Sequence, residues 1–402
     1  MKDGNSLKMY LDNQTYCPLI FNEIYADSSG EYRLCCHAGN SSCSRKYTIQ
    51  THNPFEYFNS PEMEEKRRLV LSGQKLSECQ GCYDLEKEPY VIPKKGISAV
   101  KSYRTKAFKK LWRTNFIAPT SVDKVSLKLR INGNFCNLSC YMCIPFNSTT
   151  RKVEMNKIYP EGWDFFSGSK SIPLKSERWE LIVNNIIENI DKISDIHLTG
   201  GEPLQLPKHW ELLDRIPDEY AKQIHLQYDT NFTKLQYKNH HVQDVENRFK
   251  SVYWGISCDH YGEKLAYIRY PIDVKQFETN LQETSNFKSK VIQCTVSILN
   301  IEELIQIKEY YKNNFNLNTM FTSIVRFPEF LSIRNLPEKR KEELIDLYTP
   351  SYDDLDHGEI FYAIQELKNV GKLDRLKQLK GYLKKLSEHR NTDHTKLWPQ
   401  YA

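Results

Sequence analysis

The chain has 402 residues, of which 40% are hydrophobic and 12% aromatic, and this composition predicts a globular protein of two or three domains. Basic residues exceed acidic residues by only five, an excess too small to indicate a nucleic-acid-binding protein. No run approaches the roughly 20 apolar residues of a membrane helix, and no signal-peptide core is visible, so we expect a cytoplasmic protein without membrane contact. In that compartment the eleven cysteines indicate metal binding rather than disulfides.

The first predicted domain, residues 1–95, is rich in cysteine. Residues 16–24 and 31–36 are predicted to form the two strands of a hairpin around a polar turn. Ser60 is a predicted N-cap and Pro61 stands at the first helical position, so a helix is expected to begin there. On spacing alone, the cysteines permit a four-cysteine zinc ribbon. They are Cys17, Cys35, Cys36, Cys43, Cys79 and Cys82, the last two in a C-x2-C knuckle.

A linker with a short helix is predicted for residues 96–124, which are mixed and basic. Residues 125–131 then alternate between apolar and polar side chains, which predicts a strand. Because a parallel strand buried on both faces is normally apolar throughout, the polar face indicates a sheet whose inner side holds a polar ligand. The alternative is a solvent-exposed antiparallel strand. The apolar set is Val125, Leu127, Leu129 and Ile131.

Three cysteines follow this strand in a C-x3-C-x2-C run formed by Cys136, Cys140 and Cys143. Thiolates are soft ligands that suit iron–sulfur clusters, and three of them leave one iron of a four-iron cluster open. A structural zinc ion would need a fourth protein ligand, and the next histidine along the chain is His197. The run therefore indicates a cluster with an open coordination position.

Five further strands are predicted downstream, and helical patterns separate them. They are residues 195–199, 223–230, 252–259, 291–298 and 320–325. The helix predicted for residues 176–190 carries an apolar stripe typical of a core-facing surface. This alternation predicts βαβ units and a parallel sheet of α/β class. Ligands of such sheets collect at the carboxyl ends of the strands, where Cys136, Gly200, Asn231 and Ser257 all fall.

The strand at residues 195–199 ends in Gly200, Gly201, Glu202 and Pro203. The glycines allow the backbone to approach a ligand closely, the carboxylate can hold an ammonium group, and the proline stiffens the exit. Together with the cysteine run upstream, this Gly-Gly-Glu-Pro stretch resembles the S-adenosylmethionine motif of the radical SAM enzymes. The resemblance implies a partial (β/α)6 TIM-like barrel.

For this chain, the resemblance places the barrel at residues 125–335. It implies that Cys136, Cys140 and Cys143 hold a [4Fe–4S] cluster whose fourth iron is chelated by the cofactor S-adenosyl-L-methionine. In the family, reduction cleaves the cofactor to a 5′-deoxyadenosyl radical, which abstracts a hydrogen atom from the substrate. An iron–sulfur-dependent oxidoreductase or transferase is therefore expected, with a reducing partner such as flavodoxin or ferredoxin.

The cysteines of the N-terminal domain resemble those of the SPASM domain, whose auxiliary clusters accompany many radical SAM enzymes. The shared features are the spacing Cys17-x12-Gly30-x4-Cys35 and the Cys79-Gln80-Gly81-Cys82 knuckle. Here the domain precedes the barrel instead of following it, and its later C-x5-C-x3-C portion is missing. The smaller twitch version, with one auxiliary [4Fe–4S] cluster, is therefore implied. Its ligands would be Cys17, Cys35, Cys79 and Cys82, with Cys36 as the competitor of Cys35 and zinc as the alternative metal.

Residues 254–273 resemble the fourth strand and following loop of the SPASM/twitch group, where a serine and an arginine help hold the carboxylate of S-adenosylmethionine. This implies such roles for Ser257 and Arg269, since a hydroxyl and a guanidinium fork suit a carboxylate. A surface ion pair is the alternative for Arg269. Met142 stands where the family commonly has an aromatic residue, and its thioether is expected to cover the adenine. The expected cofactor-binding set is Gly200, Gly201, Glu202, Pro203, Asn231, Ser257, Asp259, Arg269 and Met142.

Residues 336–402 are predicted to be a C-terminal helical segment, in which residues 367–386 form a solvated packing helix. The end of this segment, with Arg390 and Trp398, resembles the tail of twitch-containing radical SAM proteins. The predicted function is thus modification of an unactivated C–H bond, with a peptide or protein as the substrate. One alternative is the same initiation chemistry on a small molecule, sugar or nucleotide. Another is a non-catalytic zinc or iron–sulfur scaffold. The sequence assigns no catalytic base or radical quencher.

Overall fold

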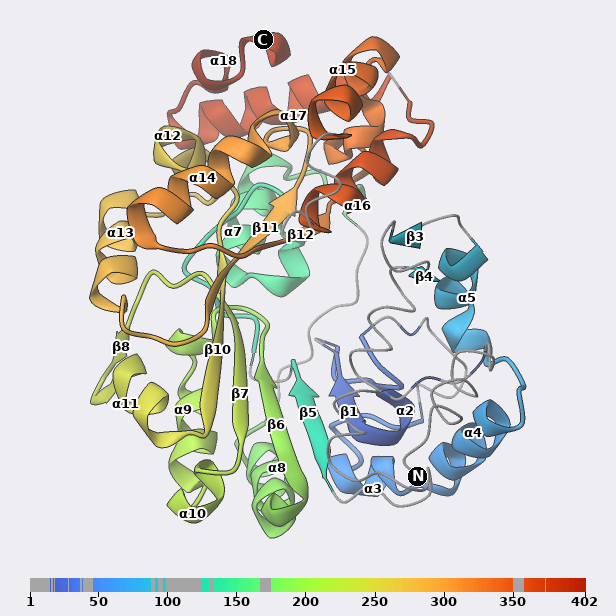
Figure 1. Cartoon of the computed structure of the whole chain (residues 1–402). Helices are drawn as coiled ribbons and strands as arrows, with labels where there is room; N and C mark the ends of the chain where they lie inside the picture. Colours follow the sequence, from blue (N-terminus) through green and yellow to red (C-terminus); the bar gives the residue numbers. More distant parts are fainter. Residues whose placement is uncertain are drawn as a thin grey trace. The chain divides into compact units, whose positions relative to one another are not determined.

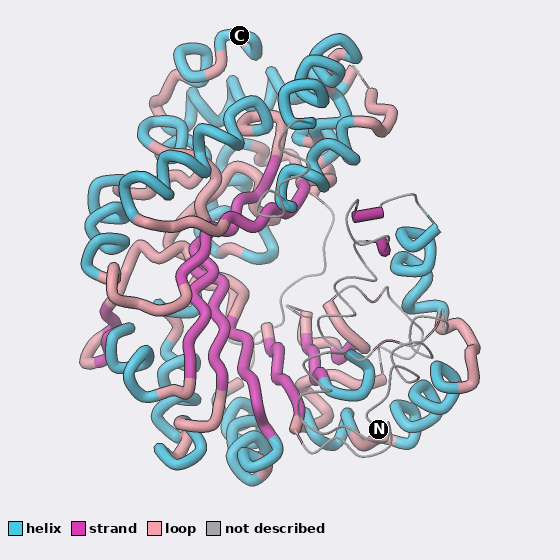
Figure 2. Tube along the Cα trace, viewed as in Figure 1, coloured by secondary structure: helices cyan, strands magenta, loops and turns pink. Residues whose placement is uncertain are grey.

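The computed structural model describes residues 15, 17, 19–27, 29–36, 38, 46–87, 91–92, 97–98, 124–130, 133–166, 175–349, 358–372 and 374–402. Its elements are labelled in Figure 1 and are distinguished by type in Figure 2. The linker predicted for residues 96–124 falls almost entirely outside these ranges, and so does Cys43.

The structure is α/β, with a mostly parallel eight-stranded sheet in the order β12-β11-β10-β7-β6-β5-β1-β2. All six strands predicted from the alternating and apolar runs are present. They are β5 (Val125–Leu129), β6 (Ile193–Leu198), β7 (His225–Thr230), β10 (Ser251–Ser257), β11 (Lys290–Val296) and β12 (Met320–Ile324). Two short two-stranded sheets pair β3 (Val91–Ile92) with β4 (Ile97–Ser98) and β8 (Gln236–Tyr237) with β9 (His240–His241).

The predicted two-faced strand is confirmed in β5. Its residues Val125, Leu127 and Leu129 are buried, and the intervening Ser126 and Lys128 are half-buried. The alternative of an antiparallel strand is excluded, because β5 pairs in parallel with β6 on one side and with β1 (Glu23–Ala26) on the other. The half-buried polar side chains of β5 therefore belong to a parallel strand. This agrees with the expected polar ligand on that side of the sheet.

Helices lie between successive strands, as βαβ units require, and the succession can be followed by colour in Figure 1. The helix α8 (Ser176–Glu188) precedes β6 and buries the predicted stripe, including Trp179 and Ile186. The remaining helices between strands are α7 (Thr149–Ile158), α9 (Pro207–Arg215), α10 (Asp218–Ala221), α11 (Val242–Arg248), α12 (Gly262–Ile268), α13 (Val274–Glu283) and α14 (Leu304–Phe315).

The N-terminal segment begins differently from the prediction. A strand was expected over residues 16–24, but Leu19–Asn22 form the short helix α2, and only Glu23–Ala26 form β1. Leu19, Ile20 and Phe21 are all buried, and a short apolar run does not distinguish a buried helix from a buried strand. The hairpin itself is confirmed, because β1 pairs antiparallel with β2 (Tyr32–Arg33).

The helix predicted at Ser60 and Pro61 is confirmed as α4 (Pro61–Leu71), and the Ser60 hydroxyl accepts a hydrogen bond from Met63 N at 3.3 Å. It is preceded by α3 (Pro54–Phe58) and followed by a 3-10 turn, Ser77–Cys79, which leads into α5 (Gln80–Lys87). The Cys79–Cys82 knuckle thus spans the junction between that turn and α5.

The C-terminal segment is helical, as predicted, and consists of α15 (Glu338–Tyr348), α16 (Gly358–Leu367), α17 (Arg375–Arg390) and α18 (His394–Leu397). The single helix expected over residues 367–386 is interrupted between α16 and α17. Up to residue 386, α17 buries Leu379, Tyr382, Leu383 and Leu386, as expected of a packing helix, and beyond the predicted stretch it also buries Ser387 and Arg390.

Contacts divide the chain into two compact units, and each is described here by itself. The first comprises residues 1–132, 172–198 and 211–226, and the second comprises residues 133–171, 199–210 and 227–402. The first unit therefore contains the N-terminal cysteines, and the second contains every residue proposed to bind S-adenosylmethionine or its cluster. Among the described residues, no helix combines the length and the apolar character needed to cross a membrane.

Candidate active site

The loop that carries Cys136, Cys140 and Cys143, here called the cysteine loop (residues 134–143), is fixed by backbone hydrogen bonds. Ser139 N donates to Tyr270 O at 2.6 Å, and Tyr141 N donates to Ile268 O at 3.0 Å. Cys143 N turns back to Cys140 O at 2.9 Å. The loop thus pairs with the end of α12 and the residues directly after it, and the backbone bearing the three thiols is held in place.

Side chains at the start of α7 hold the carbonyl groups of the same loop. Thr150 Oγ1 donates to Cys136 O at 2.5 Å, and Ser148 Oγ donates to Leu138 O at 3.0 Å. The Ser148 hydroxyl also caps the helix by accepting from Arg151 N at 3.1 Å. Short polar side chains at a helix start commonly make such local bonds. Here they connect the helix start to the cysteine loop.

The three thiols lie close enough to influence one another electrostatically. Burial raises the pKa of Cys136, and the neighbouring Cys140 and Cys143 raise it further. Burial also raises the pKa of Cys140, while the positive charges of nearby arginines, Arg269 first among them, oppose that rise. Asn231 Nδ2 lies 3.8 Å from Cys136 Sγ, and Arg269 Nη1 lies 3.8 Å from Cys140 Sγ.

This donor set fits a cluster bound by thiolates. Metal binding deprotonates cysteine, and the resulting thiolates are stabilised by a nearby guanidinium and by an amide donor. In the described part of the chain, no group of three or more His, Cys, Asp or Glu side chains already converges in metal-binding geometry. The loop supplies the three thiols that such a cluster needs. The assignment of Cys136, Cys140 and Cys143 as its ligands stays a prediction.

The second of the two glycines after β6, Gly201, is explained by contact with the cysteine loop. Glu202 N donates to Phe135 O at 2.7 Å, so the backbone of the Gly-Gly-Glu-Pro stretch lies directly on that loop. Gly201 has φ +55°, and a Cβ placed on it would lie 2.3 Å from Phe135 O. Only glycine fits this contact without displacing the loop.

Replacing Gly201 by alanine is therefore expected to destabilise the protein beyond the cost of its backbone conformation. Gly262 is a matched control, because it has φ +57° and nothing within 4 Å of an added Cβ. Gly262→Ala should lower the free energy of unfolding by roughly 1–2 kcal/mol. Gly201→Ala should lower it by at least about 1 kcal/mol more, because the loop must also shift. Urea unfolding of both variants decides this, and equal losses would show that the contact with Phe135 O does not constrain the site.

Glu202 is buried, and both of its carboxylate oxygens accept protein hydrogen bonds. Oε1 accepts from Leu204 N at 3.1 Å and from Thr230 Oγ1 at 2.6 Å, and Oε2 accepts from Asn231 N at 2.7 Å. Burial raises the pKa of Glu202 to about 7, while the same three hydrogen bonds oppose that rise. The side chain thus joins the loops that follow β6 and β7. A carboxylate has about four lone-pair positions, so one remains for an ammonium group.

Arg269 and Asp259 form an ion pair inside the second unit. Arg269 Nε lies 2.8 Å from Asp259 Oδ2, and Asp259 Oδ1 accepts from Thr295 N at 2.6 Å. Arg269 is 7% exposed and Asp259 is fully buried, so the alternative of a surface ion pair is wrong. This pairing leaves Nη1 of the guanidinium directed at Cys140. Asp259 thereby orients Arg269 toward the cysteine loop.

The remaining predicted cofactor-binding residues occupy the expected elements. Asn231 follows β7, and its Nδ2 also donates to Asn137 Oδ1 of the cysteine loop at 2.9 Å. Ser257 is half-buried at the end of β10, and Met142 is buried within the cysteine loop. Pro203 begins a 3-10 turn directly after Glu202. Direct contacts thus connect Asn231, Glu202 and Arg269 to the loop, and Ser257 and Met142 are placed by their elements alone.

In the first unit, the neighbouring residues Cys35 and Cys36 have different surroundings. The charge of Cys35 contributes to the raised pKa of Tyr57, and so does the charge of Glu78, which is next to Cys79. Burial raises the pKa of Cys36, and the charge that acts on it most is that of Lys128 in β5. Cys35 therefore lies near Tyr57, and Cys36 lies near β5. Which of the two is a metal ligand stays a prediction.

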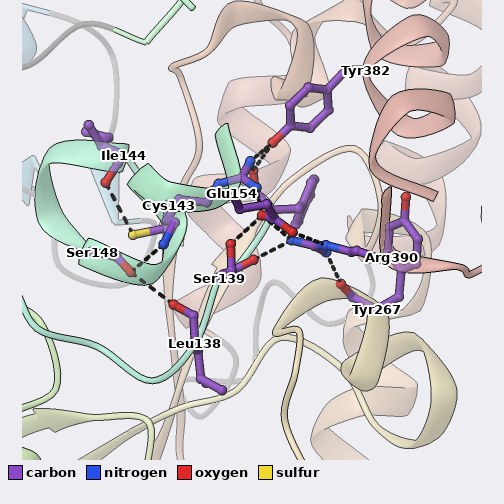
Figure 3. Close-up of polar contacts among 11 residues, drawn as sticks. Leu138, Ser139, Cys143, Ile144, Ser148, Glu154, Tyr267, Tyr382 and Arg390 are labelled. Carbon is purple, nitrogen blue, oxygen red and sulfur yellow. Dashed lines mark hydrogen bonds and ion pairs between the residues drawn. The ribbon is translucent and has the colours of Figure 1, made fainter. Parts of the chain in front are cut away.

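Sequence reasoning missed a set of buried polar residues behind the cysteine loop, shown in Figure 3. One signal was available, because the segment after the cysteine run has only three apolar residues between 149 and 158, so part of its buried face must be polar. The other members come from the C-terminal helix α17, more than 200 positions along the chain. The whole set consists of Arg151 and Glu154 from α7 and of Tyr382 and Arg390 from α17.

Comparisons with known proteins give matches in structure alone. No protein-family model and no curated protein matches the chain. It is similar to native anSMEcpe with bound AdoMet, at 16% identity and a TM-score of 0.41, covering 58% of this chain and 62% of that one. It is also similar to Streptococcus suis SuiB bound to S-adenosylmethionine, at 14% identity and a TM-score of 0.37, covering 74% and 60%. A third similar structure is TYW1 with a lysine-pyruvate adduct bound, at 14% identity and a TM-score of 0.31, covering 53% and 69%. The matches thus span about three-fifths of the length of the first two proteins.

Proposed function

We propose that the protein is a radical SAM enzyme that uses S-adenosylmethionine and a [4Fe–4S] cluster to modify a C–H bond of a peptide or protein. The observation that carries the proposal is one loop that bears the three thiols Cys136, Cys140 and Cys143 and on which the Gly-Gly-Glu-Pro stretch lies directly. When bound, the reduced cluster would supply an electron to the sulfonium of the cofactor, and the cofactor would supply a 5′-deoxyadenosyl radical to the substrate. The residues of this chain bind and orient those partners.

Three side chains are suited to hold the methionine end of the cofactor. Arg269 supplies a guanidinium oriented by Asp259, and Ser257 supplies a hydroxyl, both of which suit a carboxylate. Glu202 keeps a free acceptor position for an N–H of the cofactor's amino group. Met142, buried in the cysteine loop, is suited to contact the adenine face through its thioether.

The thiols have polar neighbours that would adjust their electronic properties. Arg269 Nη1 and Asn231 Nδ2 each lie 3.8 Å from a sulfur atom. Hydrogen-bond donors to ligating sulfurs are among the factors that set the reduction potential of a cluster. We therefore assign to these two side chains the adjustment of electron transfer from a reductant such as flavodoxin or ferredoxin.

We further propose that Cys17, Cys35, Cys79 and Cys82 hold a second [4Fe–4S] cluster, in a twitch-like domain that precedes the barrel. The resemblance to the SPASM/twitch group supports this assignment. A peptide or protein substrate rests on the same resemblance.

The proposal is tested by reconstituting the wild-type chain with iron and sulfide without oxygen, and then adding dithionite and S-adenosylmethionine. We expect 5′-deoxyadenosine to form in amounts that depend on the reductant. Protein that binds about one zinc in place of iron, or a reconstituted cluster that leaves the cofactor intact, would support the non-catalytic scaffold instead.

A further inference from the structure

The C-terminal helix α17 reaches the cysteine loop through Tyr382 and Arg390 (Figure 3). Both side chains are buried, with exposed fractions of 2% and 5%. The Tyr382 ring packs against Phe330 and Phe165, with ring centroids 4.9 and 6.2 Å away. The ring therefore anchors the helix, while the Tyr382 hydroxyl donates to Tyr141 O of the cysteine loop.

Arg390 uses all three of its guanidinium nitrogens, and each contact reaches a different part of the second unit. Nη2 donates to Ser139 O of the cysteine loop at 2.5 Å, and Nη1 donates to Tyr267 O of α12 at 3.0 Å. Nε and Nη2 form a fork on the carboxylate of Glu154 in α7, at 2.7 and 2.9 Å. One side chain thus connects the last turn of α17 to the loop and to both helices beside it.

Glu154 completes the connection from the other side. Its Oε2 also accepts from the hydroxyl of Ser139 and from Arg151. Burial raises the pKa of Glu154, but the hydrogen bond and charge of Arg390, the charge of Arg151 and the hydrogen bond from Ser139 together outweigh burial and lower the pKa to about 2. The carboxylate is therefore ionised at neutral pH, and two guanidinium groups face one carboxylate.

We propose that Arg390 is a positioning residue, which holds the cysteine loop in the conformation in which its three thiols retain a cluster. This inference rests on the proposed function. Arg390 contacts Ser139 and Glu154 rather than the thiols themselves, so it acts through the loop backbone. Outer-shell partners of metal ligands typically change metal affinity roughly 10–100-fold when they are altered.

The test compares Arg390→Lys with a matched control, Arg334→Lys. Lysine keeps the charge, but its single ammonium cannot reach Ser139 O, Tyr267 O and both oxygens of Glu154 at once. Arg334 also forms a fork on a buried carboxylate, that of Glu366, with Nε–Oε1 at 2.6 Å and Nη2–Oε2 at 3.2 Å. Its fork joins a neighbouring segment to α16 rather than to the cysteine loop.

Two readouts separate positioning from general stability. The first is the rate at which a chelator removes iron from the reconstituted protein, which should rise roughly tenfold in Arg390→Lys and stay unchanged in Arg334→Lys. The second is hydrogen exchange in metal-free protein at the amides of Ser139 and Tyr141, which should be faster in Arg390→Lys alone. Since these amides bond to Tyr270 O and Ile268 O, their exchange reports directly on how firmly the loop is held.

A second pair of variants keeps the test decisive if Arg390→Lys does not fold. Tyr382→Phe removes only the hydroxyl, which donates to Tyr141 O and accepts from Arg151, and the ring that anchors α17 remains. Tyr401→Phe is the control, because the buried Tyr401 hydroxyl donates to Ile298 O at 3.1 Å, outside the cysteine loop. We expect faster iron loss and faster exchange in Tyr382→Phe, with Tyr401→Phe like the wild type.

The outcomes distinguish this inference from the proposed function. If the wild type acquires no iron–sulfur cluster, the proposed function fails, and the exchange comparison still decides whether α17 holds the loop. The other outcome is that the wild type acquires a cluster, but neither iron loss nor hydrogen exchange is faster in the α17 variants than in their controls. Arg390 then has only a structural role, and the inference is wrong.

Discussion

Alanine at any one of Cys136, Cys140 and Cys143 is expected to abolish the formation of 5′-deoxyadenosine and to remove roughly half of the bound iron, about four atoms per chain. Each thiolate would hold a separate iron of the cluster, so no single thiol is dispensable. The loss should be complete rather than partial because the open iron, at which the cofactor would bind, exists only in an assembled cluster. The measurements are iron content after anaerobic reconstitution and chromatographic detection of 5′-deoxyadenosine.

Cys294→Ala is a suitable control for these three variants. Cys294 is a buried thiol of β11, and Asn300 Nδ2 lies 3.6 Å from its sulfur. Its removal changes the cysteine count without touching the cysteine loop, so iron content and 5′-deoxyadenosine formation should match the wild type. Cleavage retained by all three loop variants would mean that the loop does not bind the cluster.

Removal of the four N-terminal cysteines is expected to separate cleavage of S-adenosylmethionine from turnover of the substrate. A chain with alanine at Cys17, Cys35, Cys79 and Cys82 should hold about four irons instead of about eight. It should still form 5′-deoxyadenosine with dithionite, because that step needs only the first cluster, an electron and the cofactor. Modification of the substrate should fail, because the variant lacks the auxiliary cluster that would pass electrons or position the substrate. Metal analysis of both chains, with the cleavage assay, checks this.

The single variants Cys35→Ala and Cys36→Ala test which thiol belongs to the auxiliary site. Because the resemblance implies Cys35 as the ligand, through the spacing Gly30-x4-Cys35, only Cys35→Ala should lower the iron content. One zinc per chain in the wild type, lost when all four cysteines are removed, would refute an electron-transfer role for this domain.

Local patterns were sufficient to predict most of the sheet. The alternation of β5 and β7 is visible in the sequence and matches their burial, because side-chain direction in a strand has a period of two residues. Two motifs about sixty residues apart, the cysteine run and Gly200–Glu202, proved to be in direct backbone contact. The glycines were assigned to a ligand, and the structure adds a second reason for Gly201, the carbonyl of Phe135.

Interactions between distant segments could not be predicted in the same way. Leu19, Ile20 and Phe21 formed a helix instead of a strand, because a short apolar run is compatible with both. The sequence named Arg390 only as part of a tail that resembles that of twitch-containing radical SAM proteins, since its partners Ser139 and Glu154 lie more than 230 positions away. Burial of a charged side chain depends on such a partner, and helical spacing cannot identify it.

The most direct test is the EPR spectrum of the reduced chain that lacks Cys17, Cys35, Cys79 and Cys82, recorded with and without S-adenosylmethionine. In that chain the cysteine loop is the one remaining site that we assign to a cluster. We expect a [4Fe–4S]⁺ signal whose g-values shift when the cofactor is added, because its amino and carboxylate groups would bind the open iron. A cluster signal that does not change on addition of the cofactor, or a chain that holds zinc and gives no signal, would contradict our central claim.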